Sequence, residues 1–227
     1  MFWQESTPDK LPAVPDDIVD LAFAISCRAL PVDHAWALSQ AIVAILPWFA
    51  NEDGAGLHPL HVADSGNGWM RPEGADDLLC LSRRTRLVLR VPRARSEDAK
   101  LLSGAKLDVQ GHAMQVGEAQ LRLLSKETTL FSRYIVLTDA DQDENAFLAD
   151  TVRQLGAIGV RPKKMLCGLA RQLRTAGAPI NTRSLMIAEL SLEESFALQR
   201  RGLGPLRTLG CGLFIPHKGI GSLHNAE

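Results

Sequence analysis

A glycine-rich segment near the C-terminus is the local feature best suited to binding chemistry. Residues 202–212 read GLGPLRTLGCG, in which two Gly-x-Gly pairs are separated by five residues. Paired glycines let the backbone approach a ligand closely and expose its amides, and neighbouring cationic side chains suit phosphates. The candidate contacts are Gly202, Gly204, Arg207, Gly210, Gly212, His217 and Lys218. The segment lacks the Gly-Lys-Ser/Thr ending of a Walker loop, and a helix C-cap followed by a tight turn is the plainer alternative.

Histidines offer acid–base chemistry near neutral pH, and the chain has six. His34 follows Asp33, which we expect to be the N-cap of the first predicted helix because its carboxylate can accept a backbone N–H there. The helix N-terminus disfavours an imidazolium there, whereas the Asp33 carboxylate favours it. From the residues alone, a partly buried structural histidine is the more common outcome. His58 and His61 lie three residues apart on a predicted strand and therefore point to opposite faces, which is poor geometry for one metal.

Basic residues form two candidate nucleic-acid patches. The first is a run in a predicted strand, with Arg84, Arg86 and Arg90 on one face: Arg83, Arg84, Arg86 and Arg90. The second patch lies after the helix expected at 145–155: Lys163, Lys164, Arg171 and Arg174. A solvated sheet face and a surface that tracks an RNA backbone are both consistent with such patterns.

The composition is that of an ordinary globular protein, with 227 residues, 46% hydrophobic and 22% charged. The net charge of −1 argues against a non-specific nucleic-acid binder, but the charge is uneven. Residues 1–70 carry two basic and nine acidic residues, whereas residues 71–227 carry 23 basic and 17 acidic residues. The four cysteines form no CxxC pair, and no apolar stretch reaches the roughly 20 residues of a membrane span. We therefore expect a cytoplasmic protein with no metal, cofactor or membrane partner.

The order of predicted elements repeats once along the chain. The first half contains strands and helices that we expect at 18–27, 33–46, 56–63, 78–92, 96–102, 107–116 and 118–124. The second half contains those that we expect at 129–137, 145–155, 165–175, 182–190, 191–201 and 213–216. Each half reads strand–helix–strand–strand–helix–strand, the split βαβ or ferredoxin-like unit. The predicted fold is therefore α+β, with tandem ferredoxin-like (βαββαβ) domains at residues 1–125 and 126–227.

Several segments together resemble a known family. They are VDLAFAISCRALPVDHAWALSQAI, SGNGWMRPE, LSRRTRLVLRVP, TLFSRYIVL and LGCGLFIPHKGI. Together with the glycine-rich loop and the predicted strand order, these segments resemble the RAMP superfamily of CRISPR-associated proteins. Within it, the chain resembles the Cas-six endoribonucleases that mature CRISPR RNA, in the Myxan-subtype variant. The resemblance covers about residues 18–220.

The resemblance implies a function and a partner. It implies metal-independent cleavage of precursor CRISPR RNA by the substrate's own 2′-hydroxyl, which leaves a 2′,3′-cyclic phosphate and a 5′-hydroxyl. His34 lies close to the place in the chain where the family has its catalytic histidine. The following helix has no Lys or Arg that could stabilise the negative charge formed during cleavage. Arg28 is then the first choice for stabilising charge, and Arg71 the second.

Two other functions stay open at this point. The same loop and basic strands would serve a non-catalytic RNA-binding subunit of a CRISPR effector complex that holds the repeat handle. A general ferredoxin-like RNA-recognition module fits less well, because the chain lacks the aromatic-rich strand motif on which such modules stack bases. The expected partners are the CRISPR repeat RNA and other subunits of an effector complex.

Overall fold

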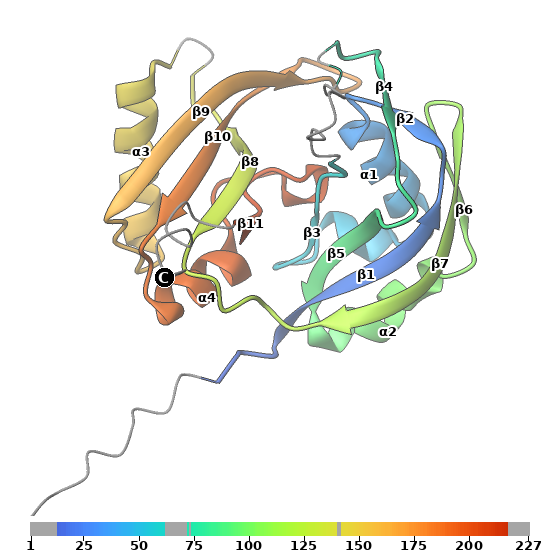
Figure 1. Cartoon of the computed structure of the whole chain (residues 1–227), viewed down its shortest axis with the longest axis horizontal. Helices are drawn as coiled ribbons and strands as arrows, with labels where there is room; N and C mark the ends of the chain where they lie inside the picture. The colour runs from blue at the N-terminus through green and yellow to red at the C-terminus, as the bar shows by residue number, and fades with distance from the viewer. Residues whose placement is uncertain (1–12, 62–71, 73, 140–141, 218–227) are drawn as a thin grey trace, which may run out of the picture.

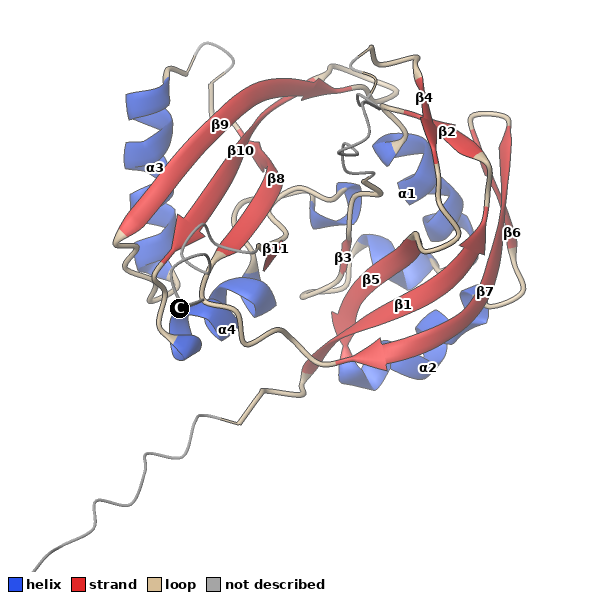
Figure 2. Cartoon of the chain, viewed as in Figure 1, coloured by secondary structure: helices blue, strands red, loops and turns tan. Residues whose placement is uncertain are grey.

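Two curved antiparallel sheets, one from each half of the chain, stand side by side in the computed structural model (Figure 1). The structure describes residues 13–61, 72, 74–139 and 142–217. We call residues 13–122 the N-terminal lobe and residues 130–217 the C-terminal lobe. The segment between them follows the last strand of the first sheet and leads into the first strand of the second (Figure 2).

The N-terminal lobe contains most of the short elements. They are β1 (Ile18–Ser26), β2 (Ala29–Pro31), α1 (Ala35–Ile45), the 3₁₀ helix η1 (Pro47–Ala50), β3 (Gly56–Leu57), β4 (Leu78–Cys80), β5 (Arg86–Pro92), η2 (Arg93–Arg95), α2 (Ser96–Ala99), η3 (Lys100–Leu102), β6 (Lys106–Val109) and β7 (His112–Arg122). The sheet order is β3-β5-β1-β7-β6, with all neighbours antiparallel, and β2 pairs with β4 in a separate ribbon.

The C-terminal lobe is simpler. Its elements are β8 (Leu130–Val136), α3 (Glu144–Ala157), β9 (Lys164–Leu173), β10 (Ile180–Ala188), α4 (Leu192–Arg201), η4 (Arg207–Leu209) and β11 (Ile215–Pro216). The sheet order is β11-β8-β10-β9, again antiparallel throughout. In both lobes the third strand of the unit lies between the first and the second, and the first lies between the third and the last. This is the ferredoxin-like arrangement that the sequence predicts; β6 adds one edge strand.

Each lobe has its own apolar core on the face that its helices cover. In the N-terminal lobe, Leu38 and Ile42 of α1 pack with Leu21 and Leu89 of the sheet. In the C-terminal lobe, α3 lies on the outer face of the sheet, and its residues Phe147 and Leu155 pack there (Figure 1). Two helices begin at side-chain caps: Ser191 and Glu194 form a capping box at the start of α4, and Asp143 accepts a hydrogen bond from the Ala146 N–H at the start of α3.

Several segments depart from the predicted elements, and of the strand expected at 56–63 only β3, Gly56–Leu57, is formed among the described residues 56–61. The predicted strand 78–92 is interrupted, because a turn at 81–85 separates β4 from β5. The predicted break between 116 and 118 does not occur, because β7 runs through it; the chain turns instead at Gln110 and Gly111, whose φ values are 54° and 80°. A two-residue turn with both φ angles positive is the hairpin connection that matches strand twist.

A third, smaller core joins the lobes. Ala35 of α1 packs there with Tyr134 of β8, Leu209 and Cys211. The described part of the chain contains no helix long and apolar enough to cross a membrane.

Candidate active site

His34 lies immediately before α1 and is 4% exposed. Its Nδ1 is 2.7 Å from the carbonyl oxygen of Pro31. A carbonyl only accepts hydrogen bonds, so Nδ1 donates, and Nε2 is the basic nitrogen of the neutral ring. The structure thus holds the ring in the tautomer that a general base at Nε2 requires.

Asp33 does not cap α1, contrary to the prediction from the sequence. His34 occupies the N-cap position, and its side chain makes no capping hydrogen bond to the helix. The Asp33 carboxylate instead accepts a hydrogen bond at Oδ2 from the backbone N–H of Arg174, at 2.8 Å. Asp33 therefore ties the start of α1 to the turn between β9 and β10, in the other lobe.

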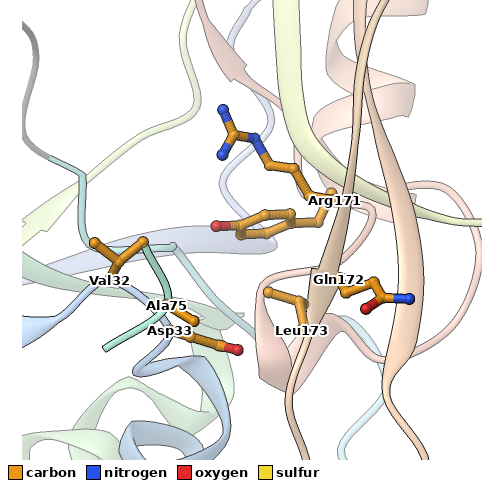
Figure 3. Close-up of a pocket in the computed structure, with 7 residues that line it drawn as sticks. Val32, Asp33, Ala75, Arg171, Gln172 and Leu173 are labelled. Atoms are coloured by element: carbon orange, nitrogen blue, oxygen red, sulfur yellow. The ribbon is translucent and has the colours of Figure 1, made fainter. Parts of the chain in front are cut away.

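A cavity of about 190 Å³ opens between the lobes beside this contact (Figure 3). The N-terminal lobe contributes Val32, Asp33 and Ala75, and the C-terminal lobe contributes Tyr134 and Arg171 among others. Figure 3 shows Arg171 on the strand of the C-terminal lobe and Val32, Asp33 and Ala75 on the segments that face it. The residue after Asp33 is His34, so the candidate base flanks the cavity.

The cavity's carboxylate is in an unusual environment. Asp33 Oδ1 is buried and has no hydrogen-bond partner in the described part of the protein. Burial raises the pKa of Asp33, while the hydrogen bond from Arg174 and the nearby charges of Arg174 and His34 oppose that rise. The Arg174 guanidinium does not form an ion pair with Asp33, because it pairs with Asp76 at 2.6 Å.

The glycine-rich loop turns its glycines into the protein. A Cβ on Gly212 would lie 2.0 Å from the Leu203 carbonyl oxygen, and one on Gly210 would lie 2.7 Å from Pro59. Gly202 ends α4 with φ 66°, and only Gly204 has open space around it. Three of the four glycines are thus explained by close packing and positive φ, which favours the alternative of a helix C-cap and tight turn.

Arg207 also serves the loop's own structure. Its guanidinium donates to the carbonyl oxygens of Arg200 and Arg201 at the end of α4, and to that of Gly54. These bonds satisfy carbonyls that a helix leaves without partners. The hollow outside the loop, about 290 Å³, is lined also by Glu52 and Asp53, whose charge disfavours a phosphate.

Arg90 is a correction to the predicted RNA surface. Its side chain is 1% exposed and forms a two-pronged pair with Asp20, at 2.8 and 2.9 Å. It also donates to the carbonyl oxygens of Gln199 and Phe214 in the C-terminal lobe. The prediction that Arg90 contacts RNA is wrong, because all its donors lie inside the protein.

The remaining arginines of the run do not share one strand face. Arg83 and Arg84 are exposed in the turn before β5, and Arg86 donates to the carbonyl oxygens of Arg83 and Thr85. Arg28 is exposed just after β1 and lines a hollow of about 440 Å³ together with Arg83. The structure therefore brings Arg28 and Arg83 together, at a place that shares no lining residue with the inter-lobe cavity.

The other predicted contacts are dispersed. Lys163 and Lys164 are exposed at the start of β9, and Lys164 pairs with Glu189. Lys164 lies seven residues before Arg171 on β9, a separation of about 23 Å at about 3.3 Å per residue. His217 is exposed, and its ring lies 5.8 Å from that of Phe131. Arg71 and Lys218 lie outside the described residues.

Comparison with known proteins settles the family. The Cas6 Crispr family model matches residues 19–219. The chain belongs to the Cas6 family. It is 31% identical over 198 residues to the CRISPR-associated endonuclease Cas6 of Myxococcus xanthus (strain DK1622), a match that spans 87% of this chain and 81% of that protein. The resemblance stated from the sequence is confirmed, and with it membership of a family of CRISPR-associated endonucleases.

Solved structures of other CRISPR-associated proteins share the fold. A Cas6-related protein from Pyrococcus furiosus aligns with a TM-score of 0.55 and 13% identity, over 87% of this chain and 98% of its own. The CRISPR endoribonuclease Cse3, bound to a 19-nucleotide RNA, aligns with a TM-score of 0.51 and 13% identity, over 87% of this chain and 96% of its own. These alignments confirm the predicted α+β RAMP fold.

Sequence reasoning missed the composition of the cavity. It named Arg171 only as part of a surface patch with the lysines, and it gave no role to Tyr134. The available signal was that Tyr134 is the chain's one tyrosine, placed in a strongly apolar strand.

Proposed function

We propose that this member of the Cas6 family is a metal-independent endoribonuclease that binds the CRISPR repeat and cleaves precursor CRISPR RNA. The observation that carries the proposal is the geometry of His34. The ring is held by Pro31 with Nε2 as its basic nitrogen, next to a cavity that contains a cationic and a hydroxyl side chain. The family assignment supplies the class of substrate.

The proposed reaction needs no group beyond the RNA and the protein. His34 Nε2 takes the proton of the 2′-hydroxyl, whose oxygen attacks the adjacent phosphorus in line. The new P–O2′ bond forms as the P–O5′ bond breaks, and the imidazolium returns a proton to the departing 5′-oxygen. The products are a 2′,3′-cyclic phosphate and a 5′-hydroxyl. Since the ring is 4% exposed, the RNA has to bring the reacting sugar up to the start of α1.

RNA binding is proposed for the exposed cationic side chains. Arg28 and Arg83 share one hollow, with Arg84 exposed beside them. Lys163 and His217 are exposed on the other lobe. Phosphate contacts of this kind position an RNA hairpin by shape and charge. We further propose that the bound product associates with other subunits of a CRISPR effector complex in the cytoplasm.

A non-catalytic RNA-binding subunit is the second candidate function. The burial of His34 favours it, because a base that substrate cannot reach performs no catalysis. Both functions require repeat binding, and only one requires cleavage.

The test compares His34 variants on the repeat RNA of the source organism. His34→Ala and His34→Asn should each abolish cleavage, while repeat affinity stays nearly unchanged. Asparagine can still donate to the Pro31 carbonyl but cannot exchange protons, so it separates acid–base chemistry from local structure. His112→Ala is the matched histidine control and should cleave as wild type. A His34 variant that cuts at the wild-type rate removes His34 from the mechanism, and tight binding by a wild type that does not cut establishes the second function.

A further inference from the structure

The inter-lobe cavity holds a cation without a protein partner. The Arg171 guanidinium forms no hydrogen bond or ion pair with any other residue that the structure describes, although it lines the cavity. Its neighbours along the strand differ in this respect: Gln172 bonds Asn181, and Arg174 pairs with Asp76. A guanidinium left unpaired in a concave site is suited to bind an anion with a planar pair of oxygens.

The other polar groups of the cavity complement that cation. Tyr134, which is 8% exposed, lines the same cavity as Arg171 and brings a phenol to it. Asp33 Oδ1 is a buried acceptor without a partner, and it does not pair with Arg171. A ligand that satisfies both sides must bring anionic oxygens for Arg171 and a hydroxyl donor for Asp33. A phosphodiester within RNA has both: its anionic oxygens, and the 2′-hydroxyl of the nucleotide that follows it, which is distinct from the nucleophilic 2′-hydroxyl that gives its proton to His34; DNA lacks these hydroxyls.

We propose that the inter-lobe cavity binds the scissile phosphate, with Arg171 supplying the stabilising positive charge and Tyr134 a hydrogen bond to the same phosphate. The proposal rests on the proposed function, and it assigns the charge-stabilising role that sequence reasoning gave to Arg28 or Arg71.

The chemistry explains why a cation is needed at this place. As the 2′-oxygen attacks, negative charge builds up on the non-bridging phosphate oxygens, and a preorganised donor stabilises it most in a site that excludes water. Arg171 stands on the lobe opposite His34, so the phosphate would lie between the two. Arg28 lines a different hollow, which shares no residue with the cavity.

The first test measures cleavage under single-turnover conditions with saturating protein. Arg171→Gln should lower the rate about 100-fold or more, the loss seen when one such donor is removed. Arg171→Lys should recover part of that loss, because it restores the charge without the fork. Tyr134→Phe should give a smaller loss. The control is Arg153→Gln, which removes an equal charge from the exposed face of α3, where Arg153 pairs with Asp150. If Arg171→Gln cuts within about threefold of wild type while His34→Ala is inactive, the proposal is wrong and the proposed function stands.

The second test reads the phosphate contact without cleavage. Non-cleavable repeat RNAs, each with a single uncharged methylphosphonate, are titrated against wild type and Arg171→Gln. At one position the methylphosphonate should weaken wild-type binding about tenfold or more and leave the affinity of Arg171→Gln unchanged. That position should be the mapped cut. Additive losses at every position overturn the proposal, as does coupling at a phosphate other than the cut. If Arg171 and one phosphate are coupled in a protein that never cuts the RNA, the cavity still binds a phosphate, but Arg171 has no catalytic role. The absence of cleavage then shows, separately, that the proposed function is wrong.

Discussion

At the scale of single residues, the most unusual group is the buried Arg90. It pairs with Asp20 on the neighbouring strand and donates to two carbonyls of the other lobe. His58 Nε2 lies 3.3 Å from Asp20 Oδ1. Removing one member of such a buried pair costs more than the pair contributes, because the other charge is left without a partner. We therefore expect Arg90, with its partner Asp20, to hold the two lobes in a fixed position relative to each other.

The same pair should give the protein's stability a defined acid dependence. Burial raises the pKa of Asp20, but the charges of Arg90 and His58 outweigh it and hold that pKa well below its usual value. A carboxyl with a lowered folded-state pKa adds stability above its unfolded pKa of about 4, and this stability is lost as the pH falls further.

Asp20→Asn tests this expectation. At pH 7 the variant should be less stable than wild type by about 3 kcal/mol, because Arg90 loses its counter-charge. The difference should narrow as the pH falls below about 4, because the Asp20 carboxyl of the unfolded wild-type chain then takes up a proton while the folded one, with its lowered pKa, stays ionised. Urea unfolding between pH 7 and pH 2.5 measures both. Asp16→Asn is the control: its partner Arg93 is exposed, so the change should cost at most about 1 kcal/mol. A difference that stays constant with pH would contradict the account.

The sequence could not assign Arg90 correctly for a physical reason. An arginine at an alternating position of a half-buried strand reads as a solvent-facing residue. Its burial depends on Asp20, 70 residues earlier, and on backbone carbonyls more than 100 residues later. No local pattern encodes those contacts.

At the scale of elements, the glycine-rich loop follows α4 of the C-terminal lobe and packs against the N-terminal lobe. The loop begins at the C-cap of α4, and its return passes so close to itself that Leu203 and Gly212 share a backbone hydrogen bond. The Gly212 N–H also donates to the Tyr134 carbonyl, so the loop is fastened to the strand that carries the cavity's phenol.

Gly212→Ala should therefore be much more damaging than Gly204→Ala. Both residues have positive φ, which costs an alanine about 1–2 kcal/mol. Only at Gly212 would the added Cβ also meet backbone, 2.0 Å from the Leu203 oxygen, whereas at Gly204 the nearest atom is 3.9 Å away. We expect Gly204→Ala to fold with a slightly lower thermal midpoint and Gly212→Ala to lose most of its folded population. Equal midpoints for the two variants would show that the loop does not need this close approach.

The elements themselves were largely predictable, and their ends less so. The apolar spacing of α1 and the capping box of α4 specify those helices locally. The Asp33 side chain was misassigned as a cap because a competing donor, the Arg174 N–H, comes from the other lobe.

At the scale of the whole molecule, the two lobes form one unit with a site between them. The repeated strand–helix order was enough to predict two ferredoxin-like lobes, because each lobe's core is made from its own segment. The cavity was not predictable in this way. Its lining comes from segments about 100 residues apart, and neither lobe carries the base, the cation and the phenol together.

In the proposed mechanism, cleavage requires both lobes. His34 comes from one lobe and Arg171 and Tyr134 from the other. The account requires the nucleophile to be the substrate's 2′-hydroxyl and the protons to pass through protein side chains.

The most direct measurement is a denaturing gel of the repeat RNA incubated with wild-type protein in excess EDTA, beside the same RNA with a single 2′-deoxy sugar at the cut. The account predicts one cut in the all-ribose RNA, a 2′,3′-cyclic phosphate on the upstream product, and no cut in the deoxy RNA. Cleavage of the deoxy RNA, or cleavage that EDTA abolishes and Mg²⁺ restores, would contradict it.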